Sequence, residues 1–497
     1  MVHTDFERCY RAVQSKDARF DGWFVTAVLT TKIYCRPSCP VRPPYARNLK
    51  FYPTAAAAQQ AGFRACKRCR PDASPGSPEW NVRGDIVARA MRLIADGTVD
   101  RDGVGGLAAR LGYTVRQLER LTQAEVGATP LALARAQRTQ MARVLIETTE
   151  MPFSDVAFAA GFASIRQFND TVRTVCDLTP TMLRHRARTR FGDDRDSRGT
   201  GVMTLRLPVR APFAFEGLFG HLAASAVPGV EEVRDGAYRR TLRLPHGSGV
   251  VSLTPHPDHV RCRLILDEFR DLAAAIARCR RLLDLDADPE AIVGALGADE
   301  HLAALVAKAP GQRIPRTVDE HELAMRVVLG QQVSVAAART HAGRLAAAYG
   351  RPIADPAGRL THVFPSAAEL SEIDPRHLAF PKARQRSLTG LVAALAEGTV
   401  VLDPGCDRIA ARVQLLALPG IGPWTTEMIA MRGLGDPDAF PATDLGVLTA
   451  AGQVGLPSAR GALADHSQRW RPWRSYVTQH LWTALDHSVN RWPPKER

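Results

Sequence analysis

The sequence predicts a multidomain α+β protein, in which a small four-cysteine domain and an all-α domain precede an antiparallel α+β domain and a second all-α domain. The 497 residues suffice for about three or four domains. Two close cysteine pairs stand near the beginning, and later blocks show either helical or strand-like periodicity. Segments rich in proline, glycine or charge separate these blocks. The predicted domains are residues 1–78, 79–188, 203–286 and 287–497, with a linker over 189–202.

Composition restricts the partners of the chain. A net charge of +14 favours a polyanionic partner, although a basic surface alone suits RNA or an anionic membrane as well as DNA. No run of about eighteen apolar residues occurs, and the first residues are charged where a secretory signal would be apolar. We therefore expect a soluble, cytoplasmic protein that acts as a monomer and has no membrane partner.

Four of the nine cysteines, Cys35, Cys39, Cys66 and Cys69, form two close pairs. This spacing lets two thiolates from one loop grip a tetrahedral metal while the second pair closes the site, which predicts one Zn²⁺ with four cysteine ligands. A closed site that only holds a loop-rich fold together remains open as an alternative. The basic neighbours expected to contact DNA phosphates are Arg36, Lys67 and Arg68.

The segments Tyr34–Cys39 (YCRPSC) and Ala61–Pro71 (AGFRACKRCRP) resemble the Ada methylphosphotriester-repair module over nearly its full length. In that family the first cysteine, here Cys35, is both a zinc ligand and the nucleophile that irreversibly takes a methyl group from a methylated DNA phosphate. Zinc keeps the sulfur deprotonated, and four thiolates keep it electron-rich. Methylation would make the site less negative and so weaken its repulsion of DNA phosphates.

The second domain repeats a helical unit, because Gly112 and Gly161 mark similar turns about fifty residues apart. In the second copy, Ser154 and Ser164 are expected to cap the two helices. One copy alone would favour a helical bundle with a solvated polar face, and two copies favour DNA binding. The side chains expected to face a major groove are Arg116, Gln117, Arg120, Arg166, Gln167, Asn169 and Arg173.

Residues 156–180 resemble the AraC-type DNA-binding domain, which carries two helix-turn-helix units on a linking helix, here at about residues 130–147. Behind an Ada-like zinc module, this resemblance implies a transcription activator. Its partners would be promoter DNA and RNA polymerase.

The third domain alternates apolar and polar residues over 203–209, 237–244, 249–254 and 259–266, before a helical pattern at 272–283. This pattern predicts a small antiparallel sheet with helices. From about residue 289 onward the pattern is helical almost throughout.

A hairpin at Leu418–Trp424 (LPGIGPW) opens a helix at Pro423, so Gly420 and Gly422 are expected to expose backbone N–H groups to a DNA phosphate. A glycine hairpin alone is weak evidence, since many helix starts need one for geometry only. Asp444 follows about twenty residues later. This order, with Val327–Ser334 and Trp473–Tyr476, resembles the helix-hairpin-helix DNA glycosylases, in particular AlkA-type 3-methyladenine glycosylase II, from about residue 203 to the end.

The resemblance implies that Asp444 supports charge at the sugar as the damaged base departs. It also implies a monofunctional enzyme, because Trp424 stands where bifunctional relatives carry a lysine nucleophile. An isolated aspartate is more often a helix cap, and the two tryptophans could equally be core residues. The residues expected to form the base pocket are Trp424, Trp482 and Met428, and those expected to contact DNA here are Gln331, Gln332, Gly420 and Gly422.

The sequence thus predicts a fused alkylation-response protein, both a suicidal methyl acceptor that activates transcription and a glycosylase that excises bases such as 3-methyladenine. The alternative is a transcription regulator with structural zinc, whose glycosylase half binds DNA without catalysis. Met428 and Gln332 depart from the best-known AlkA pattern and leave the range of excised bases open.

Overall fold

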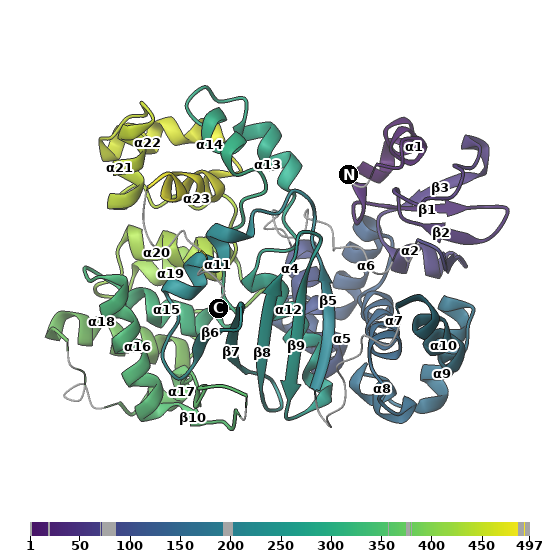
Figure 1. The fold of residues 1–497 in the computed structure, drawn as a ribbon, viewed down its shortest axis with the longest axis horizontal. Helices are drawn as coiled ribbons and strands as arrows, with labels where there is room; N and C mark the ends of the chain where they lie inside the picture. The colour runs from purple at the N-terminus through teal and green to yellow at the C-terminus, as the bar shows by residue number, and fades with distance from the viewer. Residues whose placement is uncertain are drawn as a thin grey trace. The chain divides into compact units, whose positions relative to one another are not determined.

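The computed structural model describes residues 2–17, 20–69, 71, 86–191, 202–355, 357–373, 378, 380–485 and 492. They form two compact units, which Figure 1 shows as ribbons: residues 1–208 with 245–247 and 263–277, and residues 209–244 with 248–262 and 278–497. The linker predicted over 189–202 lies outside the described residues except at its two ends. Along the described ranges, no helix combines the length and apolarity needed to span a membrane.

The beginning of the first unit is a small sheet that the sequence patterns did not predict. Strand β1 pairs antiparallel with β2 and β3, and β4 pairs parallel with β2, giving the order β3-β1-β2-β4. The ring of Phe51 lies 5.3 Å from that of Phe24 and forms part of the core on this sheet. The elements are η1 Val2–Thr4, α1 Phe6–Gln14, β1 Val25–Val28, β2 Ile33–Cys35, η3 Ala46–Asn48, β3 Leu49–Tyr52, α2 Ala55–Gln60 and β4 Arg64–Ala65.

The all-α part of the first unit contains two helix-turn-helix copies, α5–α6 and α8–α9, joined by the long helix α7. Gly112 and Gly161 have φ of 75° and 84° at the two turns, a left-handed conformation that glycine adopts at little cost. Ser164 caps its helix as predicted, but the helix expected to be capped by Ser154 begins at Phe153 instead. The helices are α4 Ile86–Ala95, α5 Thr98–Leu111, α6 Val115–Val126, α7 Pro130–Thr148, α8 Phe153–Ala159, α9 Ile165–Cys176 and α10 Pro180–Phe191.

A five-stranded sheet in the order β5-β9-β8-β7-β6 confirms the predicted α+β region. Strand β6 was not predicted, because its sequence Glu-Glu-Val-Arg does not alternate. Its Glu231 is nevertheless buried, where it bonds Arg240 at 3.0 Å. The elements are β5 Val202–Pro208, α11 Phe215–Ala224, β6 Glu231–Arg234, β7 Ala237–Arg243, β8 Ser248–Pro255, β9 His259–Leu266, η5 Phe269–Asp271 and α12 Leu272–Leu282.

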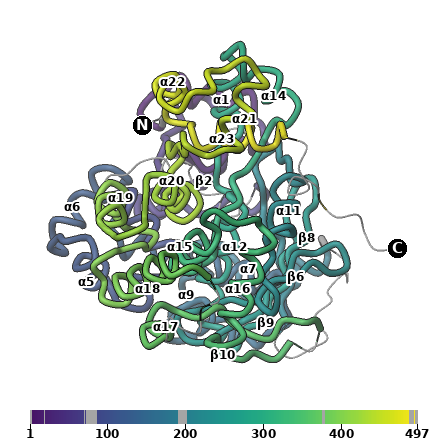
Figure 2. Tube along the Cα trace, turned by 90° about the vertical axis from the view of Figure 1, so that its left-hand side faces the viewer, coloured from purple at the N-terminus to yellow at the C-terminus, as the bar shows by residue number. Residues whose placement is uncertain are grey.

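The remaining chain is almost entirely helical, as predicted, and it packs around two hydrophobic clusters. One cluster includes Leu323 and Leu388, the other includes Val447 and Val477, and Trp482 packs against both. Helices α14, α21, α22 and α23 gather at one end of the second unit (Figure 2). The helices are α13 Pro289–Leu296, α14 Ala303–Lys308, α15 Glu320–Leu329, α16 Val335–Tyr349, α17 Ala367–Leu370, α18 Lys382–Ala396, α19 Arg408–Leu416, α20 Pro423–Met428, α21 Leu445–Gln453, α22 Arg460–His466 and α23 Arg474–Ala484. The shorter elements are β10 Arg351–Pro352, β11 His362–Val363, the π-helical turn η7 Ile429–Gly433 and η8 Ser467–Trp470.

His480 on α23 makes the stability of the second unit depend on pH. Its side chain is almost fully buried, its Nδ1 has no hydrogen-bond partner among the described residues, and burial lowers its pKa to about 4. Between pH 4 and about 6.5 the unfolded chain therefore binds a proton that the folded chain does not, so stability falls as pH falls through this window. The contribution lost is about 3 kcal/mol.

We expect His480→Gln to remove this part of the pH dependence from the free energy of unfolding, measured by denaturant titration at several pH values. His185→Gln, at an exposed position on α10, is the control. Equal slopes for the wild type and both variants would show that His480 does not carry the effect.

Candidate functional sites

The fold of the small sheet brings the two cysteine pairs together. Strands β2 and β4 run parallel, with Tyr34 opposite Ala65, and the next residue of each strand's chain is a cysteine. The backbone N–H of Cys66 donates to the carbonyl of Tyr34 at 2.9 Å. Because parallel strands end at the same edge, Cys35 and Cys66 arrive at one place, and each is followed by a loop that carries its second cysteine.

The geometry of the four cysteines fits a zinc ion. Their sulfur atoms all lie within 4.8 Å of one another, and all four side chains are buried. Sulfurs at about 2.3 Å from a tetrahedral zinc ion lie about 3.8 Å apart, which this cluster allows. Four soft thiolates, without a carboxylate or imidazole among them, are the donor set of a closed zinc site. Cys35, Cys39, Cys66 and Cys69 therefore form a site for one Zn²⁺.

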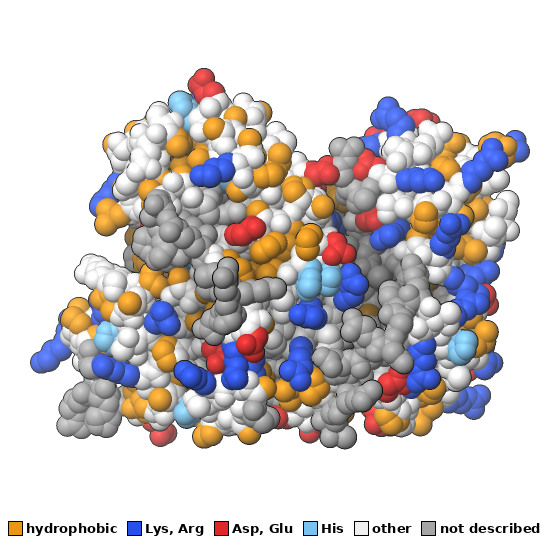
Figure 3. Space-filling view, in the orientation of Figure 1, with side chains coloured by type: hydrophobic (Ala, Val, Ile, Leu, Met, Phe, Trp, Pro, Cys, Tyr) orange, Lys and Arg blue, Asp and Glu red, His pale blue; other side chains and the backbone are white. Residues whose placement is uncertain are grey.

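Acidic residues hold the basic neighbours of this site. Asp21 accepts hydrogen bonds from the backbone and hydroxyl of Ser38, at 3.0 and 2.6 Å, and pairs with Arg36 at 3.4 Å. Asp177, at the end of α9, accepts from Lys67 at 2.6 Å. Two of the three predicted phosphate contacts, Arg36 and Lys67, thus have carboxylate partners, and the side chains of Lys67 and Arg68 are both exposed. On the face drawn in Figure 3, several Lys and Arg side chains lie on the surface of the first unit.

The helix-turn-helix side chains singled out by the sequence lie on the outer faces of α6 and α9. Five of them are exposed at the surface: Arg116, Gln117, Arg120, Arg166 and Arg173. Gln167 and Asn169 are partly buried. The side chain of Gln117 also accepts hydrogen bonds from the backbone and hydroxyl of Thr114, so it completes the capping box in which Thr114 is the N-cap of α6.

The glycine hairpin before α20 is braced from two sides. Gly420 has φ of 80° and packs so tightly on Ser387 of α18 that a Cβ would collide with the serine hydroxyl. The amide of Gln331 donates to the carbonyl of Gly420 at 3.0 Å and to the hydroxyl of Thr425 at 2.9 Å. Gln332, next in the chain, is exposed, with φ of 54°. A Cβ on Gly422 would meet open space, so this side of the hairpin backbone is uncovered.

Asp444 is a helix cap, as an isolated aspartate often is, and it also binds both predicted pocket tryptophans. Its Oδ1 accepts from the backbone N–H of Val447 and from the indole Nε1–H of Trp482, both at 2.9 Å. Its Oδ2 accepts from the indole Nε1–H of Trp424 at 2.9 Å. Met428, predicted to line the base pocket, is buried within the first hydrophobic cluster of the second unit.

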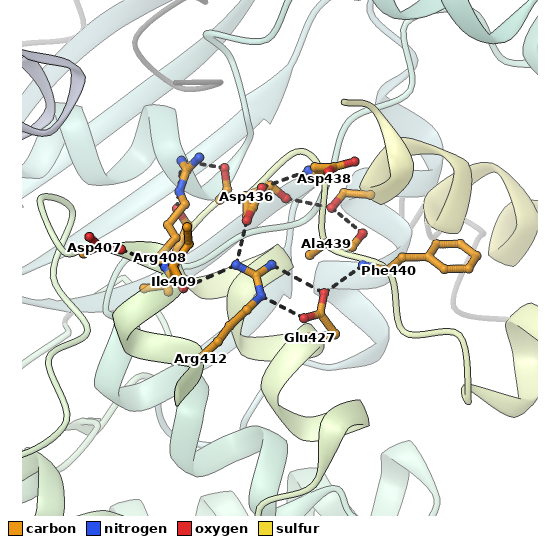
Figure 4. Close-up of polar contacts among 12 residues, drawn as sticks. Asp407, Arg408, Ile409, Arg412, Glu427, Asp436, Asp438, Ala439 and Phe440 are labelled. Carbon is orange, nitrogen blue, oxygen red and sulfur yellow. Dashed lines mark hydrogen bonds and ion pairs between the residues drawn. The ribbon is translucent and has the colours of Figure 1, made fainter. Parts of the chain in front are cut away.

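A charged network connects the hairpin with the loop that leads to Asp444. Arg412 of α19 pairs with Glu427 of α20 and with Asp436, both at 2.8 Å, and Glu427 accepts from the backbone N–H of Phe440 at 2.9 Å (Figure 4). Burial raises the pKa of Asp436, but Arg408 and Arg412 outweigh burial and lower this pKa below its ordinary value. The Asp436 carboxylate is therefore ionised at neutral pH, and its pairing with Arg412 helps to fix the loop relative to the hairpin.

Sequence reasoning missed the residues that support these sites rather than form them. These supporting residues bond to partners that lie 13 to 110 residues away in the sequence, and no local sequence pattern predicts such pairs. They are Asp21, Asp177, Arg412 and Glu427. Gly446 is a further supporting residue that sequence reasoning missed. Its position, two residues after Asp444, was the one sequence feature that pointed to it. A Cβ there would lie 3.3 Å from the indole nitrogen of Trp482.

Three family models match the chain. The metal binding domain of Ada matches residues 8–72, a helix-turn-helix domain matches residues 107–186, and the AlkA N-terminal domain matches residues 204–319. They confirm the resemblances to the Ada module, to a helix-turn-helix DNA-binding domain and to AlkA.

Relatives with known names match both halves. A Mycobacterium tuberculosis protein named "Probable bifunctional transcriptional activator/DNA repair enzyme AlkA" is 76% identical over 496 residues, which cover 100% of both chains. DNA-3-methyladenine glycosylase 2 of Escherichia coli is 34% identical over 57% of this chain and 97% of its own length. The E. coli "Bifunctional transcriptional activator/DNA repair enzyme Ada" is 33% identical over 37% of this chain and 49% of its own.

Proposed function

We propose that the protein repairs alkylation damage to DNA and activates transcription in response to it. The chain belongs to the family of its M. tuberculosis relative, the bifunctional transcriptional activators and DNA repair enzymes. One half accepts methyl groups from DNA methylphosphotriesters and activates transcription. The other half hydrolyses the N-glycosidic bond of alkylated bases such as 3-methyladenine. The observation that supports this proposal most strongly is that one chain carries both the four-cysteine cluster and an aspartate held by two indole groups beside a glycine hairpin.

In the first half, Cys35 is the proposed nucleophile. Bound Zn²⁺ keeps the cysteine sulfurs deprotonated at neutral pH. The Sγ of Cys35 attacks the methyl carbon, the carbon–oxygen bond of the phosphotriester breaks, and the electron pair stays on the phosphate oxygen. The products are a thioether and an ordinary anionic phosphodiester, so no further reactant is needed. Cys39, Cys66 and Cys69 remain ligands, and the less negative site then tolerates DNA phosphates better.

In the second half, Asp444 supports the departure of the base. An alkylated purine carries positive charge, which moves to the sugar as the glycosidic bond breaks and the bonding electrons stay with the base. The carboxylate of Asp444 stabilises that charge at the sugar, as fixed opposite charges do in a transition state. Water then adds to the sugar carbon and releases a proton to the carboxylate. Trp424 offers no amine, so the reaction ends without strand cleavage.

DNA contacts complete the proposal. Arg116, Arg120, Arg166 and Arg173 face outward on α6 and α9, where arginine can read guanine edges or bind phosphates in the major groove. The uncovered hairpin backbone at Gly422 suits a phosphate of the damaged strand, and Gln332 suits the gap that a flipped base leaves. We further propose that the protein acts in the cytoplasm as a monomer and recruits RNA polymerase to the promoter.

Zinc removal tests whether the two activities are separate. We expect protein stripped of zinc by a chelator to lose methyl uptake from methylphosphotriester DNA, because the thiols are then largely protonated and the cluster unsupported. Release of 3-methyladenine should continue at the original rate, because the cysteines and Asp444 belong to different compact units.

Both activities are measured on one preparation, before and after chelation and after zinc is restored. Restored zinc should bring methyl uptake back. Methyl uptake that survives complete zinc loss would contradict the proposed chemistry of Cys35, and a parallel loss of base release would contradict the separation of the two activities.

A further inference from the structure

The two indole groups at Asp444 permit an inference that rests on the proposed glycosylase function and goes beyond it. Trp424 and Trp482 are expected to form part of the base pocket. In the structure, both also direct their only polar atom, Nε1, at the same carboxylate, each at 2.9 Å and each on a different oxygen. A wall needs only an aromatic face, whereas this arrangement uses the one hydrogen-bond donor that distinguishes tryptophan from phenylalanine.

The hydrogen bonds also distinguish the two oxygens of Asp444. A carboxylate accepts at about four lone-pair positions, two on each oxygen. Oδ1 accepts from both Val447 and Trp482, so both of its positions are filled. Oδ2 accepts only from Trp424 among the described residues, so one position remains open. The open lone pair on Oδ2 is the one that can approach a sugar carbon or accept a proton from water.

Local packing supports the placement of Trp482. Gly446 lies in the first turn of α21, where a Cβ would sit 3.1 Å from Oδ1 of Asp444 and 3.3 Å from two atoms of the Trp482 ring. Contacts this short would displace the indole by a few tenths of an ångström. Glycine at this position therefore lets the ring approach the helix end closely enough to donate its hydrogen bond.

We propose that Trp424 and Trp482 are positioning residues, which act through Asp444 by holding its carboxylate with Oδ2 directed at the flipped nucleotide. Trp482 and Val447 fix Oδ1 to the end of α21, and Trp424 fixes the rotation of the carboxylate plane. Each bond joins a neutral donor to an anion, a type worth enough that its loss slows a reaction about 10- to 100-fold. The loss appears in kcat because the carboxylate acts on the transition state.

The test compares Trp424→Phe and Trp482→Phe with the wild type in the full-length protein, using release of 3-methyladenine from methylated duplex DNA. Trp473→Phe is the matched control, because its ring packs on Tyr476 in the same unit, 5.9 Å between centroids, and among the described residues it makes no hydrogen bond to Asp444. We expect Trp424→Phe and Trp482→Phe each to lower kcat about 10- to 100-fold with little change in KM. Gly446→Ala keeps both indole groups and should lower kcat less.

Nuclear magnetic resonance supplies a readout that a merely structural role would not move. The chain has seven tryptophans, and Asp444→Asn should shift two of their indole N–H resonances, those of Trp424 and Trp482, which single Trp→Phe variants assign. The proposal would be overturned if Trp424→Phe and Trp482→Phe had the same kcat as Trp473→Phe, or if they changed only KM, as the loss of a pocket wall would. It would also be overturned if the resonances that shift in Asp444→Asn belonged to tryptophans other than Trp424 and Trp482. Equal kcat for wild type and Asp444→Asn would instead overturn the proposed glycosylase function.

Discussion

Replacing Asp444 by asparagine should lower the release of 3-methyladenine from methylated DNA by roughly 10²- to 10³-fold or more, because the substitution removes the only charge of the group proposed to stabilise the sugar cation. Asparagine is nearly isosteric and caps helices as well as aspartate does, so the hydrogen bond to Val447 and the start of α21 should persist. The expected loss is therefore one of chemistry rather than of folding. Chromatography of released bases under single-turnover conditions measures it.

Asp407→Asn is the matched control for this experiment. Asp407 caps α19 in the same compact unit, where its carboxylate accepts from the backbone N–H groups of Ile409 and Ala410 at 2.9 and 3.1 Å. The same chemical change should there leave the rate within about twofold, since Asn and Asp are equivalent caps. Base release by Asp444→Asn as fast as by the control would reject the catalytic role of Asp444 and favour a glycosylase half that only binds DNA.

Replacing Cys35 by alanine should abolish methyl uptake from methylphosphotriester DNA, because the three remaining cysteines are ligands without the proposed nucleophilic position. In the wild type, one methyl group should appear on Cys35. Trypsin does not separate Cys35 from Cys39, because the intervening Arg36 precedes a proline, so fragment ions within one peptide must locate the methyl group. The released phosphodiester can be followed in parallel as loss of triester from the DNA.

Cys9→Ala is a suitable control, because Cys9 is a buried cysteine of the same small domain that lies outside the four-cysteine cluster. It should accept one methyl group as the wild type does. Methyl found on Cys39, Cys66 or Cys69 of the wild type, or undiminished uptake by Cys35→Ala, would contradict the assignment. No methyl at all on the wild type would leave a zinc site with a structural role only.

Local patterns predicted the elements whose chemistry is local. The cysteine spacing is enough to predict the metal cluster, and period-two alternation predicts β7, β8 and β9 to within about two residues. Strand β6 was not predicted, because its buried Glu231 is paired with Arg240 of the neighbouring strand, and the sequence alone does not show this partner. The small sheet around the cysteines was not predicted either, because its strands have only two to four residues each, too few to show a clear alternating pattern.

In the candidate sites too, local motifs were predicted from the sequence, whereas contacts made by folding were not. The hairpin and Asp444 were identified from motif order, but the sequence could not show which way the indoles of Trp424 and Trp482 turn. That orientation depends on tertiary packing between two core clusters and on the absence of a Cβ at Gly446. Pairing of Lys67 with Asp177 likewise required the fold, because 110 residues separate them.

The central claim is that one chain performs two separate repair reactions, and one crossed experiment tests it most directly. Wild type, Cys35→Ala and Asp444→Asn are each incubated with DNA that carries both methylphosphotriesters and 3-methyladenine, and protein methylation and base release are measured in the same tube. The account predicts that Cys35→Ala loses only methylation and Asp444→Asn loses only base release. Loss of both activities in either variant, or of neither, would contradict it.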